Sequence, residues 1–196
     1  MSRLFVLARH GESVLNEERR VNGDPQRPAP LTPHGRDEAR LLGVQLRAVP
    51  LEGCVHTRFG RTVETAEIAL AGRPVPLERE PLLDDVDVGE LEGETLERYR
   101  DWKQLHTADD SFPGGESLND AARRYATGFR RLLETDWSSI LVVCHEIPIR
   151  YALNAAAGSE ELDRPVHAIP NAAPFLFDED GLARAAGRIE ELVPES

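Results

Sequence analysis

Two histidines stand at the ends of apolar runs. His10 follows Arg9 and the apolar residues 4–8, and His145 follows the apolar residues 140–144. A neutral imidazole can act as a nucleophile near pH 7, and a guanidinium holds oxyanions through planar, charged donors. Such groups at the end of a buried strand fit the edge at which α/β folds bind ligands. If the two runs form neighbouring parallel strands, both imidazoles and Arg9 share one crevice.

Gly11 directly follows the first of these histidines. A glycine at a strand end lets the backbone turn tightly and come close to a ligand. We therefore predict that Gly11 allows the chain to approach the molecule that the crevice binds.

The rest of the chain alternates between strand and helix patterns. Strands are predicted at residues 4–7, 51–56, 75–77 and 140–144, and helices at residues 12–20, 32–49, 60–70, 95–105, 117–132 and 146–153. This alternation predicts an α/β fold, a three-layer α/β/α sandwich with a mainly parallel sheet. The length fits a single domain over residues 1–196. Residues 173–177 and 182–188, on either side of an acidic turn, predict a terminal hairpin.

Composition excludes several classes of partner. The net charge of −12 argues against a nucleic-acid surface and against an anionic membrane, although converging arginines could still hold an anionic substrate. No apolar run reaches the length of a membrane span, and the first residues lack a signal-peptide pattern. Cys54 and Cys144 lie in apolar segments and are expected to be buried free thiols in a cytoplasmic protein. No cluster of Cys and His has metal-ligand spacing, so no metal is expected.

Seven short motifs occur in a fixed order along nearly the whole chain. They are residues 7–13 with Asn16, 30–32 with Gly35 and Ala39, 57–61 with Thr65 and Ala66, 85–93, 113–117, 142–145 and 171–173. Together they resemble the histidine phosphatase superfamily, also called the phosphoglycerate mutase-like family. An Arg-His-Gly triplet alone would be weak, whereas seven ordered segments are specific. The resemblance implies the phosphoglycerate mutase-like form of the α/β sandwich.

The resemblance also assigns roles in phosphoryl transfer. It implies that His10 attacks phosphorus and forms a phosphohistidine, while Arg9 and Arg61 hold the phosphate oxygens. A protonated His145 would stabilise charge on those oxygens, and Asn16 would donate a neutral hydrogen bond. These roles agree with phosphoryl transfer, which asks a protein mainly for positioning and neutralisation of charge.

The leaving oxygen needs a proton, which a carboxylic acid can donate. In the family the donor is usually a Glu four residues before the glycine of the acidic segment. Counting back from Gly89 gives Asp85, with Asp84 and Glu90 as alternatives. The same carboxylate would then activate water. No cofactor is implied.

Two further positions and one loop depart from the family pattern. Glu146 follows the second histidine where glycine is common, and we expect it to point away from the phosphate or to contact a substrate group. Arg58 stands where an acidic residue is frequent and would add positive charge at the mouth. The loop at residues 22–30, which includes Gly23, does not match cleanly, and we expect Arg27 and its neighbours to shape a distinct pocket wall. The predicted substrate-binding residues are Gly11, Asn16, Gly23, Arg58 and Glu146.

These observations favour a metal-independent phosphatase that hydrolyses a small phosphorylated metabolite. The alternatives are a phosphoglycerate mutase and a catalytically weak phosphate-binding regulatory module. Mutases of this family tend to carry added segments that close the site, and the chain is compact between Gly93 and Gly114. The motifs do not identify the leaving group, and they leave a homodimer open.

Overall fold

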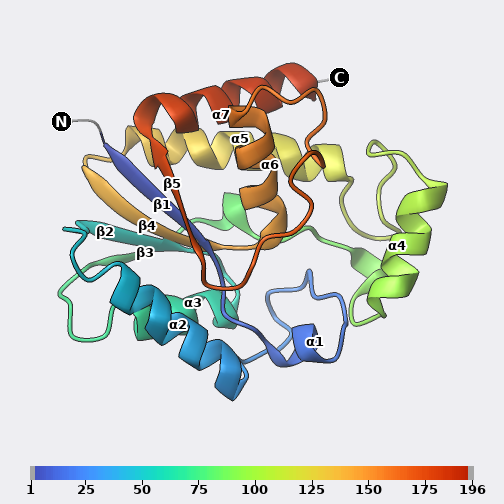
Figure 1. Cartoon of the computed structure of the whole chain (residues 1–196). Coiled ribbons are helices and arrows are strands. Elements are labelled where there is room, and N and C mark those ends of the chain that lie inside the picture. Colours follow the sequence, from blue (N-terminus) through green and yellow to red (C-terminus); the bar gives the residue numbers. More distant parts are fainter. Residues whose placement is uncertain (1–2, 194–196) are drawn as a thin grey trace.

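A computed structural model describes residues 3–193, and within that range five strands form one sheet between layers of helices (Figure 1). The strands are β1 (Leu4–Arg9), β2 (Gly53–His56), β3 (Leu77–Arg79), β4 (Ser139–Cys144) and β5 (Pro174–Asp178). Their order across the sheet is β3-β2-β4-β1-β5, and β5 alone runs antiparallel to its neighbour. The predicted α/β sandwich with a mainly parallel sheet is confirmed.

Helices cover both faces of the sheet. One layer contains α2 (Pro33–Gln45) and α3 (Gly60–Ala69), and the other contains α5 (Leu118–Glu134), α6 (Glu146–Ala156) and α7 (Glu179–Leu192) (Figure 1). Successive side chains of β1 and β4 point to opposite faces of the sheet. Phe5 and Leu7 therefore belong to one hydrophobic core, and Val6 and Ala8 belong to the other. The short helices are α1 (Val14–Glu17), η1 (Pro81–Leu83) and η2 (Gly89–Leu91), and α4 (Leu96–Leu105) stands apart from the sheet (Figure 1).

The two central strands bring the histidines together. β1 and β4 are parallel neighbours, with Arg9 opposite Cys144 in the register. The backbone N–H of His10 donates to the backbone carbonyl of Cys144 at 3.0 Å. Because parallel strands end at the same edge, residues that follow β1 and β4 emerge side by side, as the apolar runs predicted.

Side-chain caps fix the starts of several helices. The Thr32 hydroxyl accepts from the Gly35 N–H ahead of α2, and Pro33 occupies the first helical position. Ser117 and Asp120 form a reciprocal capping box at the start of α5. These caps confirm the helix starts predicted from the sequence.

The predicted terminal hairpin is wrong. β5 is present, but residues 179–192 form α7 and not a returning strand. Asp178 caps this helix by accepting from the Gly181 N–H, and Leu182, Ala185 and Ile189 are buried at helical spacing. The third strand also lies further along the chain than predicted, at Leu77–Arg79.

Cys54 and Cys144 are buried free thiols, as expected. Among residues 3–193 no helix is both long and apolar enough to cross a bilayer.

Candidate active site

A cleft of about 890 Å³ opens at the carboxyl ends of β1 and β4. The side chains that line its floor include Arg9, His10, Arg61, Asp85 and Glu146. These residues come from four separate segments of the chain, which the fold brings to one edge of the sheet. The cleft therefore gathers most of the residues that the motifs singled out.

His10 lies at the base of the cleft and is 2 % exposed. Its Nδ1 lies 2.7 Å from the Gly11 carbonyl oxygen, which can only accept, so Nδ1 carries the proton and Nε2 keeps a lone pair. Burial, followed by the charges of Arg61 and Arg9, holds the pKa of His10 well below its ordinary value. A neutral ring with a fixed tautomer is the form that can act as a nucleophile.

Arg61 bridges the two imidazoles. Its Nε donates to His10 Nε2 at 2.9 Å, and its Nη2 lies 3.2 Å from His145 Nδ1. The guanidinium also lies over the Phe59 ring, 4.3 Å from the centroid, and its side chain is only 4 % exposed. Burial lowers the pKa of Arg61 to about 10, so this residue remains a cation at neutral pH.

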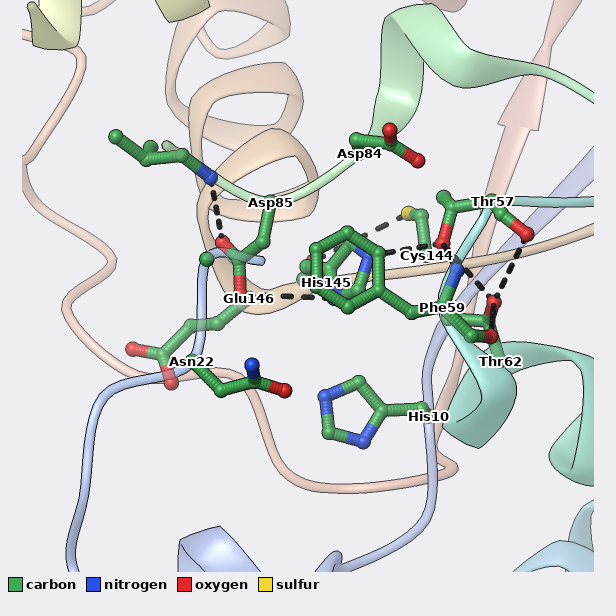
Figure 2. A network of polar contacts seen from close by, with 12 residues as sticks. His10, Asn22, Thr57, Phe59, Thr62, Asp84, Asp85, Cys144, His145 and Glu146 are labelled. Atoms are coloured by element: carbon green, nitrogen blue, oxygen red, sulfur yellow. Dashed lines mark hydrogen bonds and ion pairs between the residues drawn. The ribbon is translucent and has the colours of Figure 1, made fainter. Parts of the chain in front are cut away.

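A chain of hydroxyls orients His145, which lies behind the cleft floor with its ring centroid 5.4 Å from that of His10 (Figure 2). Thr62 Oγ1 donates to the Phe59 carbonyl, Thr57 Oγ1 lies 2.9 Å from Thr62 Oγ1, and His145 Nε2 lies 2.9 Å from Thr57 Oγ1. If each hydroxyl donates along this chain, Nε2 carries the proton and Nδ1 faces Arg61. Burial, followed by the Arg61 charge, keeps the pKa of His145 well below its ordinary value.

Asp85 places its carboxylate beside these groups. Its Oδ2 lies 3.3 Å from Arg61 Nη2 and 3.5 Å from His145 Nδ1, and its Oδ1 accepts from the Val86 N–H at 3.1 Å. Burial raises the pKa of Asp85 although the Arg61 charge opposes the change. A carboxyl with a raised pKa at the edge of an anion site is suited to donate a proton.

The alternatives to Asp85 do not reach the cleft. Asp84 is 3 % exposed, accepts from the Arg58 backbone N–H at 2.9 Å and pairs with the Arg58 guanidinium, and Figure 2 shows its carboxylate apart from His10 and His145. Arg58 is held by this pair and does not line the cleft, so its predicted place at the mouth is wrong. Glu90 lies in η2, away from the cleft lining.

Arg124 holds the acidic segment in place from α5. Its guanidinium donates to the backbone carbonyls of Leu82, Asp84 and Asp85 and pairs with Glu116. Glu116 in turn accepts from the Asp87 N–H at 3.0 Å. The glycine-rich turn before α5 therefore contributes a carboxylate that helps to position Asp85.

Asn22 is a site residue that the sequence did not reveal. Its side-chain oxygen accepts from Arg61 Nη1, and its backbone carbonyl accepts from Arg61 Nη2 at 3.1 Å. Gly23 does not line the cleft; its N–H donates to Glu92, and a Cβ there would lie 2.1 Å from the Val86 carbonyl oxygen. Gly23 thus acts through close packing that brings Asn22 to Arg61.

Gly11 also serves packing in this structure. A Cβ at position 11 would lie 2.3 Å from the Gly35 carbonyl oxygen, and the Gly11 N–H donates to Thr65 Oγ1 at 3.0 Å. The structure thus gives Gly11 a packing role, and the approach of its backbone to a ligand stays a prediction. Asn16 does line the cleft, and its Oδ1 accepts from Ser13, which leaves the amide N–H₂ as its donor toward a ligand.

Glu146 does not point away from the cleft. It begins α6, lines the floor, and pairs with Arg9 Nη1 at 2.9 Å. Arg9 Nη1 also donates to the Ile169 carbonyl at 2.9 Å. Across residues 3–193 no group of three or more His, Cys, Asp or Glu side chains is arranged to hold a metal ion.

Comparison with known proteins agrees with this geometry. The family model of the histidine phosphatase superfamily (branch 1) matches residues 5–181. The chain belongs to this superfamily. It is 30 % identical over 160 residues to a probable phosphoglycerate mutase, GpmB, of Salmonella choleraesuis, covering 78 % of this chain and 74 % of that protein.

Solved structures of other proteins share this fold. YhfR of Bacillus stearothermophilus superposes with a TM-score of 0.78 and 27 % identity, covering 88 % of this chain and 89 % of that one. A putative alpha-ribazole-5'-P phosphatase of Escherichia coli superposes with a TM-score of 0.77 at 23 % identity, covering 91 % of both chains. The phosphoglycerate mutase-like architecture predicted for this chain is therefore confirmed.

Proposed function

We propose that this protein is a metal-independent phosphatase that hydrolyses small phosphomonoesters through a phosphohistidine on His10. The observation that carries the proposal is the pair of buried imidazoles, 5.4 Å apart, joined by one arginine that contacts both. Arg9, Arg61 and Asn16 supply donors for phosphate oxygens, and Asp85 supplies a proton. The nucleophile, the donors to phosphate oxygens and the proton donor are thus side chains that line the cleft, whereas the neutral His145 contacts Arg61 from behind them.

In the first step, His10 Nε2 attacks phosphorus and a P–N bond forms as the ester P–O bond breaks. The proton of Asp85 moves to the leaving oxygen, so the alcohol departs neutral and Asp85 becomes a carboxylate. The Nδ1–H of His10 keeps its hydrogen bond to the Gly11 carbonyl oxygen, and this bond stabilises the positive charge that the ring acquires.

In the second step, the Asp85 carboxylate takes a proton from a water molecule whose oxygen attacks the phosphohistidine. The P–N bond breaks, inorganic phosphate leaves, and His10 returns to its neutral form. Asp85 is protonated again, so the cycle closes without any other reactant.

The direct test is turnover of p-nitrophenyl phosphate in the presence of EDTA. We expect phosphate release that EDTA does not reduce, together with an acid-labile phosphoenzyme after rapid quenching. Both signals should vanish in His10→Ala and persist in the surface variant His34→Ala. A protein that hydrolyses no monoester of a broad panel would support the regulatory-module alternative.

Mutase activity is the second candidate, because the relative at 30 % identity is a probable phosphoglycerate mutase. Exchange of phosphate between 2- and 3-phosphoglycerate should be compared with their hydrolysis in the same assay. Hydrolysis as the faster reaction supports the phosphatase, and exchange as the faster reaction supports the mutase. We place the reaction in the cytoplasm, a proposal that rests on the two free, buried thiols.

A further inference from the structure

Glu146 joins two arginines at the floor of the cleft. One carboxylate oxygen, Oε2, lies 2.9 Å from Arg9 Nη1, and the other, Oε1, lies 3.3 Å from Arg150 Nη1. The Glu146 side chain is 29 % exposed, whereas that of Arg150 is 11 % exposed. An ion pair this far from bulk solvent is screened less than a surface pair and holds its geometry better.

The contact determines which edge of the Arg9 guanidinium is free. Nη1 is occupied by Glu146 and by the Ile169 carbonyl. Nε is buried and has no hydrogen-bond partner among residues 3–193. The N–H groups of Nε and Nη2 lie along one edge of the planar guanidinium, and this edge can donate to two oxygens of a phosphate. Glu146 therefore fixes the Nη1 end of Arg9, and Nε is left as a buried donor that a phosphate oxygen could satisfy.

The same carboxylate begins a chain of charges that reaches α4. Arg150 Nη2 pairs with Asp163 Oδ1 at 2.7 Å, and Asp163 Oδ2 pairs with Lys103 Nζ at 3.2 Å. Lys103 lies on α4 and lines the cleft. Arg9 is thus connected to α4 through Glu146, Arg150, Asp163 and Lys103.

Besides this chain of charges, helix α4 is held at its start, where Glu97 pairs with Arg19 at 2.6 Å and the Leu96 N–H donates to the Arg19 carbonyl at 2.9 Å. None of its residues is fully buried, and it stands apart from the sheet (Figure 1). Its apolar contacts include Tyr99 and Trp102, whose ring centroids lie 5.5 and 4.2 Å from that of the buried Phe112. A helix with few buried contacts shifts at small free-energy cost, so one ion pair can bias its position.

We propose that Glu146 is a positioning residue for the Arg9 clamp, and that the chain Arg9–Glu146–Arg150–Asp163–Lys103 couples phosphate binding to the position of α4. The inference rests on the proposed function, because it takes Arg9 as a phosphate ligand. A bound phosphate shares the Arg9 guanidinium with Glu146. The Glu146 carboxylate then shifts toward Arg150. This shift alters the Arg150–Asp163 and Asp163–Lys103 ion pairs, and so the position of α4 in the wall of the cleft.

The first test uses Glu146→Gln, which keeps the side-chain size and removes the charge. Without the competing carboxylate, inorganic phosphate should bind about threefold more tightly by calorimetry. Because the clamp loses its fixed pose, kcat for p-nitrophenyl phosphate should fall at least tenfold. If Glu146 had only a structural role, its replacement would weaken phosphate binding and lower kcat together. The control Glu190→Gln, at a surface ion pair with Arg130, should change neither value.

The second test follows α4 directly through the fluorescence of Trp102. In a Trp137→Phe background Trp102 is the sole tryptophan, because the chain has two. Addition of phosphate should change its emission, and this change should be lost in Asp163→Asn, which breaks the chain without touching the clamp. The control Glu190→Gln should keep the full change.

The outcomes separate the two proposals. A wild-type protein that neither binds phosphate nor turns over any monoester overturns the proposed function and this inference with it. A wild-type protein that binds phosphate and hydrolyses monoesters, while Glu146→Gln keeps its kcat and Asp163→Asn keeps its fluorescence change, overturns only the inference.

Discussion

The Nε atom of Arg61 lies 2.9 Å from Nε2 of His10 and donates a hydrogen bond to the lone pair that would attack phosphorus. The guanidinium therefore covers the lone pair of His10 Nε2. A phosphate entering the cleft offers stronger, charged acceptors to the same N–H groups, so Arg61 must exchange His10 for phosphate oxygens before attack. Under the proposed mechanism, binding of the substrate and release of the His10 lone pair are therefore one event.

Replacement of Arg61 by lysine should expose this dual role. Lysine keeps the charge but has no planar fork, so it cannot contact both imidazoles and Asn22 together. We expect kcat/KM for p-nitrophenyl phosphate to fall about 100- to 1,000-fold, the range for loss of one donor to a developing oxyanion. Arg58→Lys, at the pair outside the cleft, should stay within a few fold of the wild type. Equal losses in both variants would contradict the assigned role.

Replacement of Asp85 by asparagine should depend on the leaving group. An alkyl ester such as glycerol phosphate needs a proton on its leaving oxygen, and its hydrolysis should fall about 100- to 10,000-fold without the acid. Phosphorylation by p-nitrophenyl phosphate needs no such proton, so the single-turnover rate of that step should fall much less.

Asp84→Asn is the matched control for this prediction. Asp84 is buried against Arg58, so its loss should lower Tm while leaving the ratio of rates for the two esters unchanged. A near-normal rate of Asp85→Asn with glycerol phosphate would remove Asp85 from the role of acid.

The dependence of kcat/KM on pH follows from the same groups. Asp85 must be protonated to donate, and burial raises its pKa, so kcat/KM for an alkyl ester should fall as pH rises through that raised pKa. His10 must be neutral to attack, and burial lowers its pKa, so no loss should occur as pH falls past the ordinary histidine value of about 6.5. Rates corrected for ionisation of the substrate test both limbs, and Asp85→Asn should abolish the alkaline one.

The sequence could predict the convergence of Arg9, His10 and His145 because each follows an apolar run. Parallel strands carry their final residues to the same edge whatever the loops between them do. The apolar runs were therefore sufficient to place these three residues, since neighbouring strands need only a consistent register.

Asn22 could not be found in this way. Its position depends on the close approach of Gly23 to the Val86 carbonyl and on hydrogen bonds from this loop to Glu92, all of them contacts between distant parts of the chain. The mistaken hairpin has a different cause. Gly181 and Gly187 suggest a turn and a weak helix, yet the buried spacing of Leu182, Ala185 and Ile189 against the core outweighs their low propensity.

Substitution of Gly11 by alanine should act on stability first. The added Cβ would lie 2.3 Å from the Gly35 carbonyl oxygen, a backbone atom that cannot rotate away. Overpacking of this kind costs about 1–3 kcal/mol of unfolding free energy, so Tm should fall by several degrees.

Gly60→Ala is the matched control, because nothing lies within 4 Å of a Cβ there and alanine favours the first turn of α3. Thermal unfolding followed by circular dichroism should show a lower Tm for Gly11→Ala and an unchanged or higher Tm for Gly60→Ala. An unchanged Tm in Gly11→Ala, with activity lost, would instead support the ligand-contacting role for this glycine.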